Sequence, residues 1–152
     1  MKLLSMRRAT IEDAGAISTL VIDAYKPYIA RIGQKPAPML DDYRNVVVEN
    51  DVFVATRGTE IVGVLVMVEE GAVLLLVNVA VAPRQKGQGI GKMLMAFCEE
   101  HARAVGSQAI RLYTHELMIE NVEIYRKLGY RETHRAIEDG FPRVFMRKVL
   151  VA

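Results

Sequence analysis

Three glycines within five residues form the part of this sequence best suited to ligand chemistry. Gly87, Gly89 and Gly91 lie in VAVAPRQKGQGIGKML, between an apolar run and a segment with helical spacing. Glycine permits positive φ and lets the backbone approach a ligand closely. At the start of a helix, such a loop exposes free N–H groups beside the positive end of the helix dipole. The stretch therefore predicts an anion site, and phosphate is the usual ligand of such sites.

Two common nucleotide-binding motifs fail at this loop. A Walker A loop requires a glycine where this chain has Lys86, and serine or threonine where it has Met93. A dinucleotide-binding fingerprint requires a third glycine where this chain has Lys92. The pattern that remains is R-x-x-G-x-G, which begins at Arg84.

Hydrophobic periodicity predicts the elements that position this loop. We expect strands at 3–9, 51–58, 59–71, 72–83, 109–115, 130–135 and 143–150, and helices from Thr10, at 41–50, after the glycine loop and at 118–129. The segment 26–40, rich in proline and glycine, reads as a loop or a broken helix. This order predicts an α/β (α+β) fold with a mixed, mostly antiparallel sheet of about seven strands and helices on both faces.

The composition limits the class of protein. The length of 152 residues fits a single domain spanning 1–152, and a net charge of +2 is too small to argue for nucleic acid. The lone Cys98 excludes a disulfide framework, and its place on an apolar helical stripe indicates a core residue. The longest apolar run is too short to cross a membrane, and Arg7 and Arg8 interrupt the N-terminal apolar segment. We therefore expect a cytoplasmic protein that binds neither membrane nor nucleic acid.

The sequence resembles the GNAT superfamily of acyl-CoA-dependent N-acetyltransferases. NVAVAPRQKGQGIGKML resembles the strand, loop and helix of the family's central Q/R-x-x-G-x-G/A motif. NVEIYRKLGY resembles the following helix, which carries an Asn and a Tyr, and MRRATIEDAGAI resembles the opening strand and helix. The resemblance covers nearly the whole chain, and it implies acetyl-CoA as the acyl donor.

The resemblance also implies which residues bind coenzyme A. The pyrophosphate would lie on the amides of the glycine loop, and the pantetheine arm would pair with the strand at Val79 and Val81. Asn121 would contact the cofactor from the following helix. The residues implied around the pyrophosphate are Arg84, Gln85, Gly87, Gln88, Gly89, Gly91 and Lys92.

Amine acetylation requires a neutral amine, a stabilised oxyanion and a proton for the departing thiolate. Tyr125 matches the family tyrosine that acts as general acid, and a phenol is protonated at neutral pH. The central strand carries Val77 and Asn78 where many members have a glutamate. His115 has a suitable intrinsic pKa for a base, although a neutral amine needs none. The sequence shows no metal-ligand spacing, so we expect no metal.

The sequence does not identify the acceptor amine, which is a small molecule or a protein amine. Tyr28 and Arg31 lie in the segment that shapes the acceptor pocket in the family, where they could hold an amine or a carboxylate. The missing strand carboxylate leaves open a non-catalytic acyl-CoA-binding module as an alternative. The sequence also leaves open whether the protein forms a homodimer through its last strands.

Overall fold

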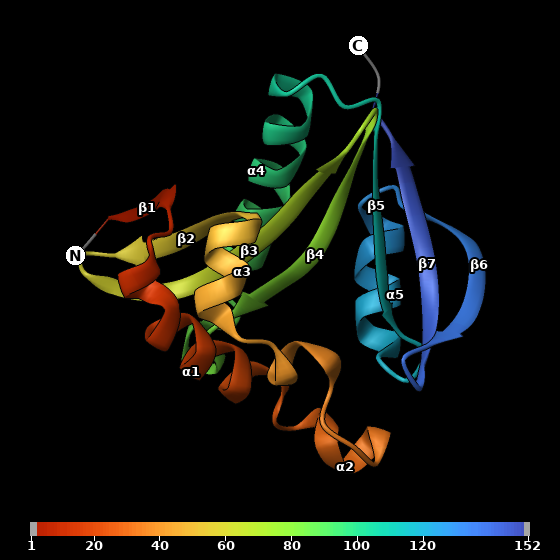
Figure 1. Cartoon of the computed structure of the whole chain (residues 1–152), viewed down its shortest axis with the longest axis horizontal. Helices are drawn as coiled ribbons and strands as arrows, with labels where there is room; N and C mark the ends of the chain where they lie inside the picture. The colour runs from red at the N-terminus through yellow and green to blue at the C-terminus, as the bar shows by residue number, and fades with distance from the viewer. Residues whose placement is uncertain (1–2, 151–152) are drawn as a thin grey trace.

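The computed structural model describes residues 3–150; residues 1, 2, 151 and 152 of the expected 1–152 domain lie outside them. The strands are β1 Leu4–Arg8, β2 Asp51–Arg57, β3 Glu60–Glu70, β4 Val73–Val81, β5 Ala109–His115, β6 Arg131–Glu138 and β7 Phe141–Val149. The α-helices are α1 Ala14–Tyr25, α2 Tyr28–Ile32, α3 Tyr43–Glu49, α4 Ile90–Ala104 and α5 Ile119–Lys127, and short 3-10 turns are η1 Ile11–Asp13, η2 Ala37–Leu40 and η3 Pro83–Gln85. The seven strands form one sheet in the order β1-β2-β3-β4-β5-β7-β6 (Figure 1).

The sheet is antiparallel except at one pair. Strands β1 to β4 form a meander, and β5 pairs with β7, which pairs with β6, all antiparallel. Only β4 and β5 run parallel. The two hairpin turns of the meander contain Gly58 and Gly71, both at positive φ, where glycine avoids the strain of a side chain.

Helices cover both faces of the sheet. Successive side chains of a strand point to opposite faces, and here the strands carry apolar side chains on both faces. Leu65 and Met67 of β3 pack with the apolar stripe of α4, while Val64 and Val66 face α1 and α3. The α4 stripe consists of Ile90, Leu94, Met95, Cys98 and Ala102. Burial raises the pKa of the Cys98 thiol to about 12, as expected for a core cysteine.

A β-bulge changes the direction of the side chains in β4. Val66 pairs with Asn78 whereas the next residue, Met67, pairs with Leu76, so Val77 is the extra residue. Before the bulge, Leu76 belongs to the core under α4. After it, the Asn78 side chain faces α1 and α3, and Val79 lies on the side of α4.

Strands β4 and β5 separate beyond this bulge. Their pairing covers only Val73–Leu76 with Ala109–Leu112, and β5 continues to His115 in pairing with β7. Figure 1 shows the two strands together at one end and apart at the other. The edge of β4 from Val77 to Val81 that faces β5 therefore has no strand partner.

The expected fold class is confirmed, with a seven-stranded mixed sheet and helices on both faces. The segment 26–40 is a broken helix, since α2 and η2 interrupt it. Gly129 ends α5 as expected: its φ is 99°, and the N–H of Tyr130 bonds to the carbonyl of Tyr125 at 3.0 Å. None of the helices in residues 3–150 combines the length and apolar character needed to cross a membrane.

Candidate active site

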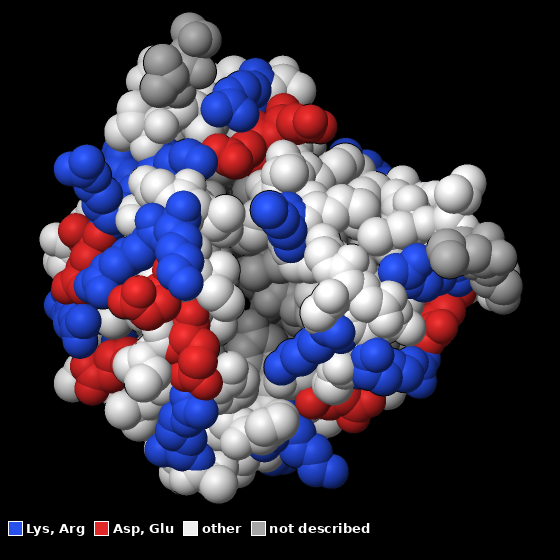
Figure 2. Space-filling view, turned by 180° about the vertical axis from the view of Figure 1, so that it is seen from behind, with Lys and Arg blue, Asp and Glu red and all other residues white. Residues whose placement is uncertain are grey.

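A cavity of about 480 Å³ opens where β4 leaves β5. Its walls come from the end of α1, the start of α2, the exposed end of β4, the glycine loop, α4 and α5. Figure 2 shows a hollow near the centre of one face, with mostly uncharged walls and Lys and Arg side chains around it. The volume falls in the usual range for small-molecule sites.

The glycine loop presents free backbone donors to this cavity. The first helical bond of α4 runs from Met93 N to the carbonyl of Gly89 at 3.0 Å. Among the described residues, the amides from Gly87 to Lys92 have no backbone acceptor. Gly87 and Gly89 have φ of 82° and 81°, which a residue with a side chain adopts only with strain. The loop thus has the donors and helix dipole of an anion site.

Gly91, unlike Gly87 and Gly89, is not required by the backbone conformation. Its φ is not positive, and an added Cβ would meet only Val81 Cγ2, at an ordinary distance of 3.7 Å. The protein itself would therefore accept alanine at this position. Because Gly91 lines the cavity, the space that a methyl group would fill is space available to a ligand.

Arg57 anchors the loop from outside the cavity. Its Nε donates to Gln85 Oε1 at 3.3 Å, and its Nη2 donates to Gln88 Oε1 at 2.8 Å. Arg84 pairs with Glu60 on the adjoining strand. Arg57 gives no signal in the sequence, because it precedes the loop by about thirty residues in a segment without any motif.

Most of the implied cofactor residues line the cavity. They are Val79, Val81, Gln85, Gly87, Gly89, Gly91 and Asn121, and Lys86 lines it as well. Arg84, Gln88 and Lys92 are not in its lining. Gln88 instead contacts Arg57, and the Arg84 side chain is 73% exposed. Lys86 is thus the basic side chain that the structure places at the loop's inner surface.

Helix α5 carries Asn121 and Tyr125 one turn apart, and both line the cavity. The Tyr125 hydroxyl makes no hydrogen bond within residues 3–150. The ring lies edge-on to that of Tyr130, with 5.9 Å between the two ring centroids. Burial raises the pKa of Tyr125 above its usual value, and the nearby Cys98 and Tyr28 raise it further. The phenol is therefore protonated at neutral pH and able to donate a proton into the cavity.

Asn78 belongs to a polar chain that holds the helices over β4. Tyr25 donates its hydroxyl to Asn78 Oδ1 at 2.7 Å, and Asn78 Nδ2 donates to the Tyr43 hydroxyl at 3.3 Å. Tyr43 in turn donates to the carbonyl of Pro38 at 2.7 Å. These bonds satisfy the buried side-chain amide of Asn78 and hold α1, α3 and η2 together over β4. Asn78 therefore has a structural role in addition to any chemical one.

A second, smaller pocket of about 60 Å³ shares Tyr25 with the main cavity. Its lining consists of Tyr25, Pro36, Ala37, Pro38, Val77, Tyr113, Thr114, His115, Met118, Phe141 and Arg143. Of these residues, only His115 was expected in the site from the sequence. Arg143 gave no signal, because it lies in the last strand among other basic residues.

The hydrogen bond at His115 bears on its expected role as a base. The N–H of Leu117 donates to His115 Nδ1 at 3.1 Å. The neutral ring consequently carries its proton on Nε2, and the lone pair of Nδ1 is occupied. Burial lowers the pKa of His115, and Arg143 lowers it further against the opposing effect of Glu116. The ring is thus a neutral donor, which disfavours the general-base role.

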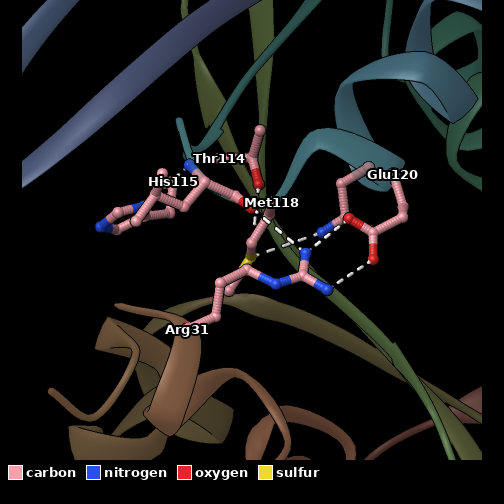
Figure 3. A network of polar contacts seen from close by, with 7 residues as sticks. Arg31, Thr114, His115, Met118 and Glu120 are labelled. Atoms are coloured by element: carbon pink, nitrogen blue, oxygen red, sulfur yellow. Dashed lines mark hydrogen bonds and ion pairs between the residues drawn. The ribbon is translucent and has the colours of Figure 1, made fainter. Parts of the chain in front are cut away.

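Tyr28 lines the main cavity, whereas Arg31 lines neither the cavity nor the smaller pocket and reaches from α2 toward Glu120 of α5 (Figure 3). Arg31 Nη1 and Nη2 donate to the two carboxylate oxygens of Glu120 at 2.6 and 3.0 Å, and Nη1 also reaches the Leu117 carbonyl at 3.2 Å. Its guanidinium lies 5.1 Å from the Tyr28 ring. The carboxylate that Arg31 holds in this structure is the protein's own, and the pair connects α2 to α5 across the cavity.

Carboxylates near the site are either paired or lie outside both cavities. Glu70 pairs with Arg111 at 2.8 Å, and neither Glu69 nor Glu116 lines the cavity or the smaller pocket. Glu120 lines the cavity, but the hydrogen bond from Arg31 lowers its pKa and keeps it ionised. Within residues 3–150, no group of three His, Cys, Asp or Glu is arranged to hold a metal ion.

The cavity brings together the free amides of the glycine loop, the open edge of β4 and the hydroxyl of Tyr125. The family model described as the acetyltransferase (GNAT) domain matches residues 48–132, more than half of the chain. The chain belongs to this family, as the sequence resemblance predicted.

Individual relatives agree with this assignment. An aminoalkylphosphonate N-acetyltransferase of Salmonella typhimurium is 29% identical over 88% of this chain and 89% of its own length. The structure of the PaiA N-acetyltransferase of Thermoplasma acidophilum in complex with coenzyme A shares the fold, with a TM-score of 0.83, 19% identity, and 97% and 99% of the two chains covered. The YncA protein of Salmonella typhimurium, solved with acetyl-CoA, matches with a TM-score of 0.73, 16% identity, and 99% and 95% covered.

Proposed function

We propose that this protein is an N-acetyltransferase that moves the acetyl group of acetyl-CoA to a primary amine by direct attack in a ternary complex. The observation that carries the proposal is one cavity that joins three features. These are the free amides of the glycine loop, the unpaired edge of β4 and the protonated hydroxyl of Tyr125.

The residues present fit coenzyme A. The amides from Gly87 to Gly91 are available to the pyrophosphate, and Lys86 adds positive charge at the same wall. The pantetheine arm contains amides and is extended, so the open edge at Val79 and Val81 offers it strand-like pairing. The space beside Gly91 leaves room for close approach.

Tyr125 serves as the general acid. The amine nitrogen attacks the thioester carbonyl, a C–N bond forms, and the C–S bond breaks as the tetrahedral intermediate collapses. Tyr125 gives its proton to the departing sulfur and recovers one from the acylated nitrogen through solvent. The burial that raises its pKa keeps the donor form present throughout the neutral range.

The described lining of the cavity offers no free carboxylate as a base. Glu120 is held by Arg31, and Asn78 is bonded to Tyr25 and Tyr43. The amine therefore enters in its neutral form, and the rate follows the fraction of unprotonated amine. The acceptor activity named for the Salmonella relative makes an aminoalkylphosphonate one of the amines to test first.

The test measures free thiol released from acetyl-CoA with a panel of primary amines, alongside calorimetric binding of acetyl-CoA. Amine-dependent thiol release together with the N-acetylated product supports the proposal. Binding of acetyl-CoA without release for any amine would instead establish the non-catalytic acyl-CoA-binding module. Absence of acetyl-CoA binding would exclude both.

A further inference from the structure

The smaller pocket has a charge that the reaction does not require. Of the described residues that line it, Arg143 is the one that carries a charge, and no carboxylate is among them. The Arg143 side chain is only 10% exposed. A buried cation at a ligand pocket is costly unless something compensates it, so its partners indicate what the pocket accepts.

The protein compensates Arg143 only in part. Its Nη1 donates to Glu138 Oε1 at 2.9 Å, and Glu138 is 49% exposed, outside the pocket lining. The guanidinium lies 4.3 Å from the Tyr113 ring, which holds it in place. Nε and Nη2 have no acceptor among residues 3–150. These donors remain available to a planar or tetrahedral anion.

His115 adds a second donor on the same wall. The bond from Leu117 occupies Nδ1, so Nε2 carries the hydrogen in the neutral ring. His115 and Arg143 both line the pocket, and the remaining lining is apolar or aromatic apart from Thr114 and the hydroxyls of Tyr25 and Tyr113. A ligand group here is offered donors and one positive charge.

The pocket is also placed to select the acceptor. Tyr25 lines both the pocket and the main cavity, where Tyr125 lies. A molecule that spans this boundary would have its amine in the cavity and its other end beside Arg143. A volume of about 60 Å³ suits an acidic group with a few carbons rather than a drug-sized ligand.

The geometry points to an acceptor that is a small primary amine bearing an acidic group, carboxylate or phosphonate, which Arg143 binds with the help of His115. This inference rests on the proposed function and specifies the substrate class of that site. A diamine would place a second positive charge against Arg143, so it is a poor acceptor.

The experiment compares amines that differ only in the acid. The pairs are β-alanine with ethylamine and 2-aminoethylphosphonate with ethylamine, and putrescine is the cationic comparison. Each is measured as kcat/KM with the wild type, Arg143→Gln and Arg143→Lys; the lysine variant keeps the charge above Tyr113 if glutamine disturbs folding. Arg135→Gln is the matched control, because Arg135 is an exposed arginine paired with Glu132 outside both cavities.

We expect acidic amines to exceed ethylamine by roughly 10- to 100-fold in kcat/KM, mostly through KM, as a charge-assisted contact would give. Arg143→Gln should remove this preference, Arg143→Lys should keep part of it, and Arg135→Gln should keep all of it. Comparison of the carboxylate with the phosphonate identifies which acid the site prefers.

The results separate this inference from the proposed function. Turnover of amines without preference for the acid, or a preference that survives Arg143→Gln, would overturn the inference and leave the acetyltransferase standing. If no amine is acetylated, calorimetry of 2-aminoethylphosphonate and β-alanine with the CoA-saturated protein still decides the inference. Binding that is lost in Arg143→Gln supports it, and absence of binding rejects it.

Discussion

The hydroxyl of Tyr125 differs from that of its neighbour Tyr130 in what surrounds it. Tyr125 lines the main cavity, whereas the Tyr130 hydroxyl is fully buried without a hydrogen-bond partner. Burial raises the pKa of both phenols. Only Tyr125 can therefore give a proton to a group in the cavity, although both are protonated at neutral pH.

Replacement of Tyr125 by phenylalanine tests this difference. We expect kcat to fall by roughly 10²- to 10³-fold, as for loss of a general acid, because the thiolate would leave without a positioned proton. Binding of acetyl-CoA and the melting temperature should change little, since the hydroxyl makes no hydrogen bond within residues 3–150. Thiol release at saturating amine and calorimetric binding measure the two effects.

Tyr130→Phe provides the matched control. It removes a buried hydroxyl that has no partner, so kcat should stay within about twofold and stability should hold or rise. Equal losses of kcat in the two variants, or an unchanged kcat in Tyr125→Phe, would show that Tyr125 is not the acid.

Gly91 allows binding to be separated from folding at a single residue. Alanine should stabilise α4 by about 0.5–1 kcal/mol, because the φ is ordinary and the new Cβ meets only Val81 at 3.7 Å. The same methyl group occupies cavity space beside the free amides, so the affinity for CoA should fall about tenfold or more. Urea denaturation and calorimetry measure the opposite changes in stability and affinity.

Gly15→Ala is the control for this prediction. Gly15 lies in α1, an added Cβ has nothing within 4 Å, and the residue does not line the cavity. A similar gain in stability with unchanged CoA affinity is expected there. If Gly91→Ala also leaves the CoA affinity unchanged, close approach of the ligand at Gly91 is disproved.

Residues with motif spacing could be found from the sequence, and residues brought in by tertiary contacts could not. Gly87, Gly89 and Asn121 occupy places in local patterns, and all three line the cavity. Arg57 and Arg143 reach the site from distant strands, where each looks like an ordinary surface arginine. Arg31 was expected near the acceptor pocket but lines neither cavity, and its pairing with Glu120 depends on the packing of α2 against α5.

At the scale of elements, the conformation of the glycine loop depends on the end of β2. Both bonds from Arg57 end on glutamines that flank Gly87, and the loop residues otherwise offer their amides to the cavity. Holding these amides in place before the ligand arrives reduces the ordering cost of binding. Arg57 is therefore a positioning residue for the cofactor loop.

Arg57→Ala tests this anchoring. We expect CoA affinity to fall about 3- to 10-fold, comparable to the loss of one or two modest hydrogen bonds, with kcat at saturation little changed. Arg111→Ala is the control, because Arg111 also lies in a strand and pairs through Nε with one side chain, Glu70, outside both cavities. If the two variants bind CoA equally well, the loop does not need the anchor.

The elements themselves were largely predictable, whereas their irregularities were not. The runs that became β2, β3 and β4 are mostly apolar over seven to eleven residues, and the turns at Gly58 and Gly71 separate them. The bulge at Val77 has no local signal, because LLLVNVAV is apolar on both sides of it. It is nonetheless the bulge that directs Asn78 toward Tyr25 and Val79 toward α4, so a regular strand assigns the wrong faces after Leu76.

At the scale of the whole molecule, the cavity lies at the junction of two parts of the sheet. The meander β1–β4 and the group β5–β7–β6 are joined by only four parallel residue pairs. Beyond these pairs, α1, α2 and α5 surround the opening, and the Arg31–Glu120 pair connects α2 with α5. A ligand along β4 would supply contacts that the sheet lacks there.

Acetyl-CoA should therefore stabilise the protein as a whole and protect particular amides. At 100 times its Kd it adds about 2.7 kcal/mol, or roughly 5–10 °C in Tm for a domain of this size. Hydrogen exchange should slow at Gly87–Lys92, whose amides lack backbone acceptors, and at Val79 and Val81 on the edge of β4 that has no partner strand. ATP and NAD at equal concentration should have neither effect. A shift with ATP or NAD but not with acetyl-CoA, or protection confined to β6 and β7, would mean that the opening between β4 and β5 receives a different ligand.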